Sequence, residues 1–327
     1  MLAFNTREDT DVEQAAQRCA HHGAPFASAK SGVRIRPMND PDLGRILELR
    51  KIVRWSADPR AFDLLRGMRD ARWAIAEDEG REPAVGMVGA VPLGEIGILC
   101  HLAVHDEYRK MGLGQELSSW AVSYLRSRDA TTVRLDATRR AEKLYGSLGF
   151  EPTSRRISYR LEGGVLAVRL RDSRFLDARS RGLRVAPLLS RDLPELYGVD
   201  YWSFGGDRSA LIRATLELHP GWGLVARDAS GRIKGYLVRS ASGATVRLGP
   251  FMASSPDAAR VLLAYALRTD GGRSVEVSVT GTTRSPAHEV LRGFGFVGRW
   301  DRLRMELGDA PDTKGLEAYG TTPYLAT

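Results

Sequence analysis

The sequence predicts an α+β protein in which one fold is used twice. Between residues 33 and 161, apolar or alternating segments typical of strands are interleaved with segments of helical periodicity. A similar succession starts again near residue 183. Leu148-Gly149-Phe150 near the end of the first series corresponds to Phe294-Gly295-Phe296 in the second. A repeat of this length indicates that a whole domain has been duplicated.

The first series has the order β-α-α-β-β-β-α-β-α-β. Asn39 or Asp40 and Thr138 are the expected N-caps, Pro59 starts a helix, and Gly149 ends one. The strand at 95–104 is mostly apolar, which predicts a central place in the sheet. Strands are predicted at residues 33–37, 72–76, 84–91, 95–104, 131–136 and 150–161, and helices at 39–50, 59–68, 117–126 and 138–147.

The second series is predicted from the same signals. Its strands are expected at 183–188, 221–226, 234–240, 246–251 and 274–279, and its helices at 192–196, 256–267 and 287–292. The resulting organisation is a flexible arm at 1–31 with a short helix near 12–19, a domain at 32–162, a linker at 163–181 with a strand near 165–170, a second domain at 182–307, and a tail at 308–327.

Composition excludes several classes of protein. No apolar run approaches the length of a membrane helix, and the polar N-terminus does not resemble a signal peptide. Cys19 and Cys100 give no disulfide framework, and the adjacent histidines His21 and His22 lie in the arm. We expect a cytoplasmic protein without a metal or a membrane partner, either a monomer or a homodimer.

The net charge of +8 raises the question of nucleic-acid binding. Only 6 of the 48 basic residues are Lys, and the arginines are scattered rather than gathered in a stripe. No aromatic-rich stacking motif accompanies them. We expect no nucleic-acid partner, and an anionic cofactor or substrate explains part of the charge.

The segment Arg109-Lys110-Met111-Gly112-Leu113-Gly114-Gln115 lies between the central strand and a helix. Its two glycines allow backbone N–H groups to converge at the helix N-terminus, where the unpaired N–H groups and the helix dipole favour anions. The side chains of Arg109 and Lys110 add positive charge. The segment therefore predicts a cradle for a pyrophosphate.

Two nucleotide-binding motifs fail to match this loop. A nucleotide-hydrolase loop needs Gly-Lys followed by Ser or Thr, whereas Gln115 and Glu116 follow Gly114. A dinucleotide fingerprint needs a third glycine, and Leu117 stands there. Arg109-x-x-Gly112-x-Gly114 instead resembles the coenzyme A loop of the GNAT acetyltransferase superfamily.

A downstream motif strengthens the resemblance. Leu135-Asp136-Ala137-Thr138 and Leu144-Tyr145-Gly146-Ser147-Leu148-Gly149-Phe150 are similar to the second GNAT motif, although many members carry Asn where Thr138 stands. The second half resembles bacterial tandem GNAT proteins with an acetyltransferase-like C-terminal domain, through its segments Leu248-Gly249-Pro250-Phe251 and Leu303-Arg304-Met305. The resemblance implies two GNAT-like folds, each a mixed, mostly antiparallel sheet with a V-shaped splay and helices on both faces.

The resemblance also implies roles for individual residues. Acetyl-CoA would be the co-substrate, with its pantetheine arm along the backbone of Leu102, Ala103 and Val104. Its pyrophosphate would lie on the loop from Arg109 to Gln115. Tyr145 would protonate the departing thiolate or donate a hydrogen bond to it. The alternative for Tyr145 is aromatic packing.

An amine must lose a proton before it attacks, so a base or a chain of waters is required. Glu95 at the start of the central strand is the first candidate, and its alternative is a solvated turn carboxylate. His101 and Asp136 are further candidates, with alternatives as a strand histidine and as a loop or helix-cap residue. Cys100 is expected to be an inert buried thiol rather than a nucleophile.

The second half lacks this machinery. Gly249 to Pro256 replaces the glycine loop, and Leu291 falls where Tyr145 would be expected. We therefore expect one active site per chain, in the first domain, that acetylates a primary amine of a small molecule by direct attack. Trp55 to Phe62 is a candidate acceptor segment. The alternatives are another acyl-CoA, a protein N-terminal or lysine amine as acceptor, or a non-catalytic coenzyme A sensor or scaffold.

Overall fold

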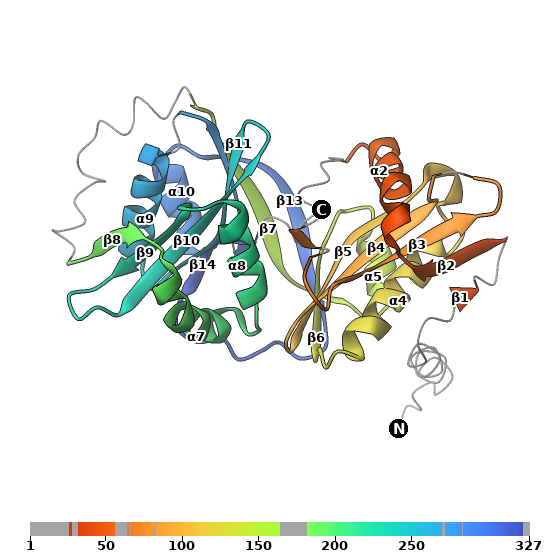
Figure 1. The fold of residues 1–327 in the computed structure, drawn as a ribbon, viewed down its shortest axis with the longest axis horizontal. Helices are drawn as coiled ribbons and strands as arrows, with labels where there is room; N and C mark the ends of the chain where they lie inside the picture. Colours follow the sequence, from red (N-terminus) through yellow and green to blue (C-terminus); the bar gives the residue numbers. More distant parts are fainter. Residues whose placement is uncertain are drawn as a thin grey trace. The chain divides into compact units, whose positions relative to one another are not determined.

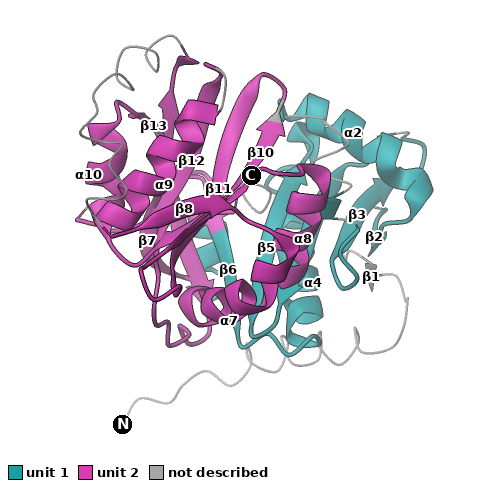
Figure 2. Cartoon of the chain, turned by 60° about the vertical axis from the view of Figure 1, so that its left-hand side comes forward, with its two compact units in different colours: residues 1–135, 143–150, 327 teal, residues 136–142, 151–326 magenta. Residues whose placement is uncertain are grey.

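The computed structural model divides into two compact units (Figures 1 and 2). Unit 1 holds residues 1–135, 143–150 and 327, and unit 2 holds residues 136–142 and 151–326. The residues described are 26–27, 32–55, 64–65, 67–81, 83–163, 182–269, 272–282 and 284–322. The predicted helices at 12–19 and 59–68, the arm, the linker and its strand lie wholly or largely outside them. The domain limits drawn from the sequence stay a prediction.

Unit 1 is built around a sheet with the strand order β1-β2-β3-β4-β5-β6. All neighbours are antiparallel except β5 and β6, which are parallel. Its elements are β1 (Phe26–Ala27), β2 (Val33–Pro37), η1 (Asp40–Asp42), α2 (Leu43–Ile52), β3 (Arg72–Asp78), β4 (Gly86–Leu93), β5 (Ile96–Val104), η2 (Asp106–Tyr108), α4 (Leu113–Arg126), β6 (Thr132–Ala137) and α5 (Glu142–Gly146), the last two crossing into unit 2 at residues 136–142.

The apolar residues of this unit explain why β5 lies in the middle of the sheet and why α4 packs on it. Every residue of β5 from Ile96 to His101 is buried, as expected for a central strand. Helix α4 covers β4 and β5 with its buried residues Leu113, Leu117 and Leu125. The residue at position 86 is glycine because an added Cβ would lie 2.8 Å from the side chain of Leu117. This close packing fixes α4, and with it the loop that precedes the helix.

Unit 2 repeats the arrangement with the strand order β13-β7-β12-β11-β10-β9-β8, and β14 pairs with β11. Here β11 and β12 form the parallel pair. Its elements are β7 (Glu151–Leu161), β8 (Arg184–Pro187), η4 (Ser190–Asp192), α7 (Leu193–Phe204), α8 (Ser209–Leu218), β9 (Gly223–Arg227), β10 (Ile233–Ser242), β11 (Thr245–Ala253), α9 (Pro256–Thr269), β12 (Ser274–Gly281), α10 (Pro286–Gly293), β13 (Val297–Leu307) and β14 (Glu317–Gly320).

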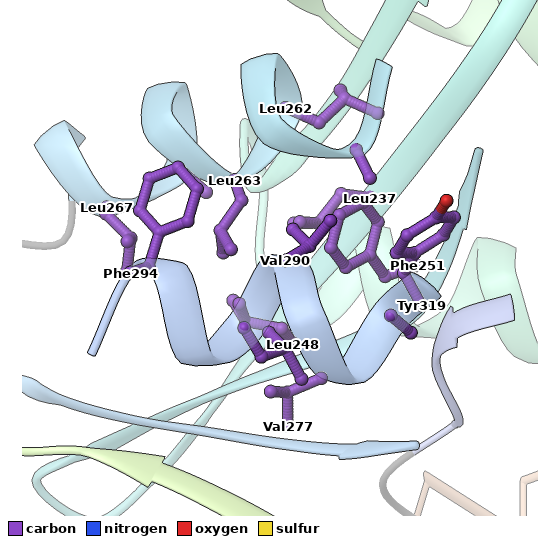
Figure 3. Packing of buried hydrophobic residues seen from close by; sticks show 14 of the residues in the cluster. Leu237, Leu248, Phe251, Leu262, Leu263, Leu267, Val277, Val290, Phe294 and Tyr319 are labelled. Carbon is purple, nitrogen blue, oxygen red and sulfur yellow. The ribbon is translucent and has the colours of Figure 1, made fainter. Parts of the chain in front are cut away.

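The core of unit 2 lies between its sheet and the helices α9 and α10. Figure 3 shows Leu263 and Leu267 of α9 beside Phe294, which directly follows α10, with Leu248 and Val277 of the parallel strands beneath them. These side chains are buried. The α+β class, the mixed sheet and the duplication predicted from the sequence are confirmed. The sequence did not indicate α8 or β14.

Strand β7 differs from expectation in its partners. The sequence predicts a strand here and assigns it to the first series as its closing strand. In the structure β7 lies between β12 and β13 and pairs antiparallel with both, for example through Tyr159 opposite Val277 and Gly298. Apolar residues of β7, among them Tyr159 and Leu161, belong to the core of unit 2. The alternation of apolar residues predicts a strand, but it does not say which sheet will receive it.

Candidate active site

The parallel strands β5 and β6 separate part-way along their length. Their pairing ends at Ile98 opposite Arg134, whereas β5 continues to Val104 with β4 still paired on its other edge. Beyond Ile98 the β6-facing edge of β5 has no paired strand among the described residues. Leu102 and Ala103, two of the predicted coenzyme-binding residues, lie with Val104 on this stretch. The splay thus exposes backbone groups that an extended ligand could pair with.

Residues 105–112 connect β5 to α4 and end in the glycine cap of that helix. Gly112 has a φ of +87°, which disfavours a side chain, and an added Cβ would have only Glu116 Oε1 near it, at 4.0 Å. The amides of Gln115 and Glu116 donate to the Gly112 carbonyl. In the described chain, the amides of residues 110–114 make no backbone–backbone hydrogen bond. Their N–H groups can therefore receive an anion at the positive end of α4.

The loop side chains divide into anchors and exposed groups. Leu113 is buried under the sheet, whereas Lys110 and Met111 are exposed. Arg109 forms an ion pair with Asp106 at 2.6 Å, and its Nε lies 3.3 Å from the Val104 carbonyl oxygen. The Arg109 side chain thus holds the loop against the end of β5 and keeps its positive charge at the predicted pyrophosphate position.

Gly114 allows close packing beneath the loop. A Cβ at this position would lie 3.0 Å from the side chain of Leu144 and 3.8 Å from that of Val104. The second glycine of the motif therefore brings α4 close to both β5 and α5. The element α5 carries Tyr145, so the same glycine helps to place the predicted catalytic tyrosine near the splay.

Tyr145 is buried and packs edge-on against Phe150, with ring centroids 5.7 Å apart. Burial raises the pKa of the Tyr145 hydroxyl, and the neighbouring Cys100 raises it further. The hydroxyl is therefore neutral over the physiological pH range and can donate a hydrogen bond. The burial and the contact with Phe150 agree with the alternative of aromatic packing. A neutral hydroxyl is also compatible with the predicted role of Tyr145 as a hydrogen-bond donor.

His101 lies in a bulge of β5, where the register with β4 shifts between Cys100 and Ala103. Its φ is +55° and its side chain is buried. A guanidinium nitrogen of Arg50 lies 2.8 Å from His101 Nδ1. Because guanidinium groups only donate, Nδ1 accepts, and a neutral ring then carries its proton on Nε2. The one lone pair of such a ring, on Nδ1, is then taken by Arg50 and is not available for the proton of an amine.

Glu95 lies in the turn before β5 and its side chain is exposed. Its backbone carbonyl accepts hydrogen bonds from the amides of Thr131 and Thr132, at 2.9 and 3.1 Å. A strand rises about 3.3 Å per residue, so Glu95 lies on the order of 20 Å from Leu102 along β5. This position agrees with the alternative of a solvated turn carboxylate and argues against a direct catalytic role.

Asp136 belongs to unit 2, where it forms a buried ion pair. Arg304 reaches both carboxylate oxygens, at 2.7 and 3.2 Å, and Arg156 Nε lies 3.6 Å away. Burial alone would raise the pKa of Asp136, but the charges of Arg304 and Arg156 outweigh burial and lower it. A carboxylate held in its charged form by two arginines is a weak base. The residue is better explained as a structural ion than as a helix cap.

Cys100 matches the expectation of an inert thiol. It is buried, and burial raises its pKa to about 12 against the opposing charge of Arg50. Few thiolates form at neutral pH, so a covalent acetyl-enzyme is disfavoured. Among the described residues, no group of three or more His, Cys, Asp or Glu could hold a metal. Sequence reasoning overlooked Arg50, because nothing in the sequence links it to His101, 51 positions away.

The corresponding region of unit 2 is closed. β11 ends at Ala253 and α9 begins at Pro256, so only residues 254–255 connect them. The hydroxyl oxygen of Ser255 accepts a hydrogen bond from the Ala258 amide at 3.2 Å, and Pro256 has no N–H. Leu291, the counterpart of Tyr145 by sequence, is fully buried. The geometry offers no loop of open amides here.

Comparison with known proteins also finds two related domains in the chain. A model of the acetyltransferase (GNAT) family matches residues 43–150, and a model of an acetyltransferase (GNAT) domain matches residues 197–320. The uncharacterized N-acetyltransferase YitH of Bacillus subtilis is 24% identical over 213 residues, which cover 65% of this chain and 70% of YitH. No helix in the described residues has the length and apolar character needed to cross a bilayer.

Solved structures share the fold at low sequence identity. A Pyrococcus horikoshii protein provisionally described as an acetyltransferase has a TM-score of 0.72 and 19% identity, covering 94% of this chain and 100% of that one. A tandem GNAT protein from the clavulanic acid biosynthesis pathway has a TM-score of 0.60 and 16% identity, covering 85% and 99%. The chain belongs to the GNAT N-acetyltransferase superfamily and carries two GNAT domains in tandem.

Proposed function

We propose that the chain is an acetyl-CoA-dependent N-acetyltransferase that acts on a primary amine of a small molecule, with its active site in unit 1. The GNAT family generally uses acetyl-CoA. The observation that carries the proposal is the glycine-capped loop of open amides directly after a splayed central strand. An inactive binding module would need the loop but would have no need of a buried, neutral tyrosine beside it.

The residues present fit the coenzyme. In the proposed complex the amides of residues 110–114 hold the pyrophosphate, with Arg109 adding charge. The backbone of Leu102 to Val104 pairs with the pantetheine amides along the open edge of β5. Gly112 leaves room for a phosphate that a side chain would fill. A coenzyme bound in this way would supply the thioester that the amine attacks.

The amine nitrogen forms a bond to the acetyl carbon, and the carbon–sulfur bond breaks. Tyr145 stabilises the departing thiolate by donating a hydrogen bond. The ordinary pKa of a tyrosine already exceeds that of a thiol, and burial raises the pKa of Tyr145 further, so the tyrosine keeps most of its proton. The proton that balances the reaction is the one lost by the amine. This argument favours hydrogen bonding over full protonation of the thiolate.

We propose that the amine proton leaves through water. Glu95 is remote and exposed, His101 Nδ1 is engaged by Arg50, and Asp136 is ion-paired in unit 2. These contacts support the water chain, which the sequence left open as an alternative to a side-chain base. A reaction of this kind depends on the fraction of free amine, so the rate should rise with pH up to the pKa of the acceptor.

The acceptor is proposed to enter beside the end of α2. Arg50 on this helix contacts the reacting strand at His101, and its guanidinium lies 5.5 Å from the ring centroid of Trp55. The segment that follows Trp55, residues 56–62, was expected to line the acceptor site and lies outside the described residues. The proximity of α2 to the bulge supports the expectation that this side of the strand receives the amine.

Thiol release from acetyl-CoA with a library of small amines tests the proposal. Turnover with a small amine supports it, and product mass spectrometry from an extract fed labelled acetyl-CoA identifies the acceptor. Turnover only with another acyl-CoA would change the proposed donor. Turnover only with a protein N-terminal or lysine amine would change the proposed acceptor. Tight coenzyme binding without turnover on any acceptor would favour a sensor or scaffold.

A further inference from the structure

The backbone register shows which residues of unit 2 correspond to the coenzyme-pairing residues of unit 1. Val104 lies opposite Gly86 on β4, and Ala253 lies opposite Gly235 on β10. Gly86 and Gly235 also share an environment, since an added Cβ would meet a leucine methyl of the covering helix at 2.8 and 2.9 Å. Counting back from these pairs, residues 251–253 of β11 correspond to residues 102–104 of β5.

In unit 2 this stretch of strand already has a partner. The parallel pairing of β11 with β12 ends at Leu248 opposite Val277. Beyond it β14 enters the splay and pairs antiparallel with β11, with Gly320 opposite Phe251. On the other side the amide of Thr321 donates to the carbonyl of Ser278 on β12, at 2.7 Å. The C-terminal segment therefore lies between β11 and β12, where the open slot of unit 1 lies between β5 and β6.

The segment fits the slot closely. Tyr319 is fully buried and its ring lies 5.6 Å from that of Phe251; Figure 3 shows the two rings side by side. A Cβ at Gly320 would lie 2.9 Å from a methyl of Val277, 3.0 Å from the Cβ of Phe251 and 3.2 Å from the Leu248 carbonyl oxygen. Only a residue without a side chain can pass between the two strands at this level.

Hydrogen bonds hold the segment at both ends. The amide of Leu316 donates to the hydroxyl of Ser203 on α7 at 3.0 Å. Arg208, which is buried and pairs with Asp200, donates to the hydroxyl of Thr322 at 3.2 Å. The segment is thus anchored before and after the slot by side chains of unit 2.

We propose that the splay of unit 2 is a peptide-binding slot whose ligand is the chain's own residues 314–322. The segment binds by strand addition and takes the place that the arm of a coenzyme would take in unit 1. Backbone pairing supplies affinity, Tyr319 fills the apolar pocket of the core, and Gly320 sets specificity. This inference concerns unit 2 and stands whether or not unit 1 acts on a small amine.

A nick in the folded full-length protein tests the proposal without interfering with folding. A recognition sequence for a site-specific protease is inserted at Asp309–Asp312, in the stretch between β13 and β14. After cleavage, the released end should stay bound on gel filtration, and a fluorescent peptide of residues 313–327 should exchange into the slot. Hydrogen exchange should show residues 251–253 protected while the peptide is bound and exposed when it is removed.

Substitution at Gly320 makes the test specific. A peptide carrying Gly320→Val should bind at least about tenfold more weakly, because the added side chain collides with both strands. In the full-length protein Gly320→Val should speed hydrogen exchange at residues 316–322. Gly198→Val is the matched control, since a Cβ on this exposed position of α7 meets no atom within 4 Å. It should leave exchange in the slot unchanged.

Three results would overturn the proposal. The first is immediate loss of the cleaved segment with no change in exchange at residues 251–253. The second is equal affinity of the wild-type and Gly320→Val peptides. The third is displacement of the bound peptide from unit 2 by acetyl-CoA, which would mean that the slot still recognises a coenzyme.

Discussion

The helices α4 and α9 follow corresponding strands in the two units, yet their N-termini are opposite in character. Before α4, residues 105–112 form a loop that ends in Gly112, and the amides of residues 110–114 make no backbone–backbone bond among the described residues. Before α9, the connection is residues 254–255, and Ser255 uses its hydroxyl to satisfy the Ala258 amide. A serine cap stabilises a helix by occupying the N–H groups that an anion would need.

The two strand splays differ in the same way. In unit 1 the β6-facing edge of β5 is open beyond Ile98, whereas in unit 2 the tail pairs with the matching edge of β11. Both splays therefore offer a strand edge, and they differ in what covers it. If the two proposals above hold, the comparison teaches that the fold supplies a slot in each unit, and that a few residues after the central strand decide whether a phosphate-bearing ligand or a peptide uses it.

The largest effect is expected from Gly112→Asp. A carboxylate at this cap would take the place of the pyrophosphate and repel it, so acetyl-CoA binding should fall below detection by calorimetry. Gly112→Asn has nearly the same shape without the charge and should retain part of the affinity. Ser255→Asp, which puts the same charge before α9, should leave affinity and stoichiometry at one coenzyme per chain. Unchanged affinity in Gly112→Asp would remove the loop from the coenzyme site.

Asp136→Asn should destabilise unit 2. Removing one partner of a buried ion pair leaves Arg304 and Arg156 uncompensated, which costs about 3–5 kcal/mol. The folded-state pKa of Asp136 is lowered, so its stabilisation is present above the unfolded carboxyl pKa and is lost as pH falls through the folded pKa. Denaturant unfolding from neutral to acid pH should show this loss in the wild type and not in the variant.

Asp136→Asn also separates structure from catalysis. If the carboxylate were the base, the variant would lose turnover even when the rate is divided by the amount of folded protein. The pH–rate profile would also change shape. We expect the profile of the folded fraction to keep its shape. Rescue of activity by low temperature or a stabilising salt would agree with a structural role.

Tyr145→Phe should lower kcat by about 10–100-fold, the cost of one hydrogen bond to a charged group. Coenzyme affinity should change by less than about twofold, because the hydroxyl is proposed to act after the thioester bond weakens. Since burial raises its pKa, the wild-type rate should show no alkaline decline from Tyr145 below about pH 10. Wild-type turnover in the variant would assign the ring to packing alone.

Tyr319→Phe is the counterpart in unit 2 and should have the smallest effect. The Tyr319 hydroxyl is buried without a hydrogen-bond partner among the described residues, and burial raises its pKa to about 12. Removing an unsatisfied hydroxyl should leave kcat unchanged and stabilise the unit by about 1 kcal/mol or less. A marked loss of stability in thermal unfolding would show that the hydroxyl is bonded in solution.

Much of the fold could be predicted because it depends on local pattern. The apolar run of β5, the turn between β9 and β10, and the helix starts at Pro256 and Pro286 all carry signals within a few residues. The loop around Gly112 was predictable for the same reason, since a positive φ at a helix start selects glycine. The site residues of this loop remain predictions until a coenzyme is bound.

The features of the fold and the site that could not be predicted depend on contacts between residues far apart in the sequence. Asp136 and Arg304 are 168 positions apart, and the sequence around either residue gives no sign of the other. His101 looks like a free imidazole until Arg50 is placed beside it. β14 carries little apolar pattern of its own, because a short strand held on both sides needs few side chains to define it. The roles of His101 and Asp136 as bases stay predictions, and the contacts with Arg50 and Arg304 that bear on them lie far away in the sequence.

The place of β7 between β12 and β13 has a consequence for how the protein is made. β7 leaves the ribosome directly after α5, whereas β12 begins only at Ser274 and β13 at Val297. Both edges of β7 must wait for these partners while the intervening chain is synthesised. During that interval the strand can pair with the same region of another nascent chain. Expression at low temperature or with a holdase chaperone should therefore raise the yield of soluble protein more than stabilising either core.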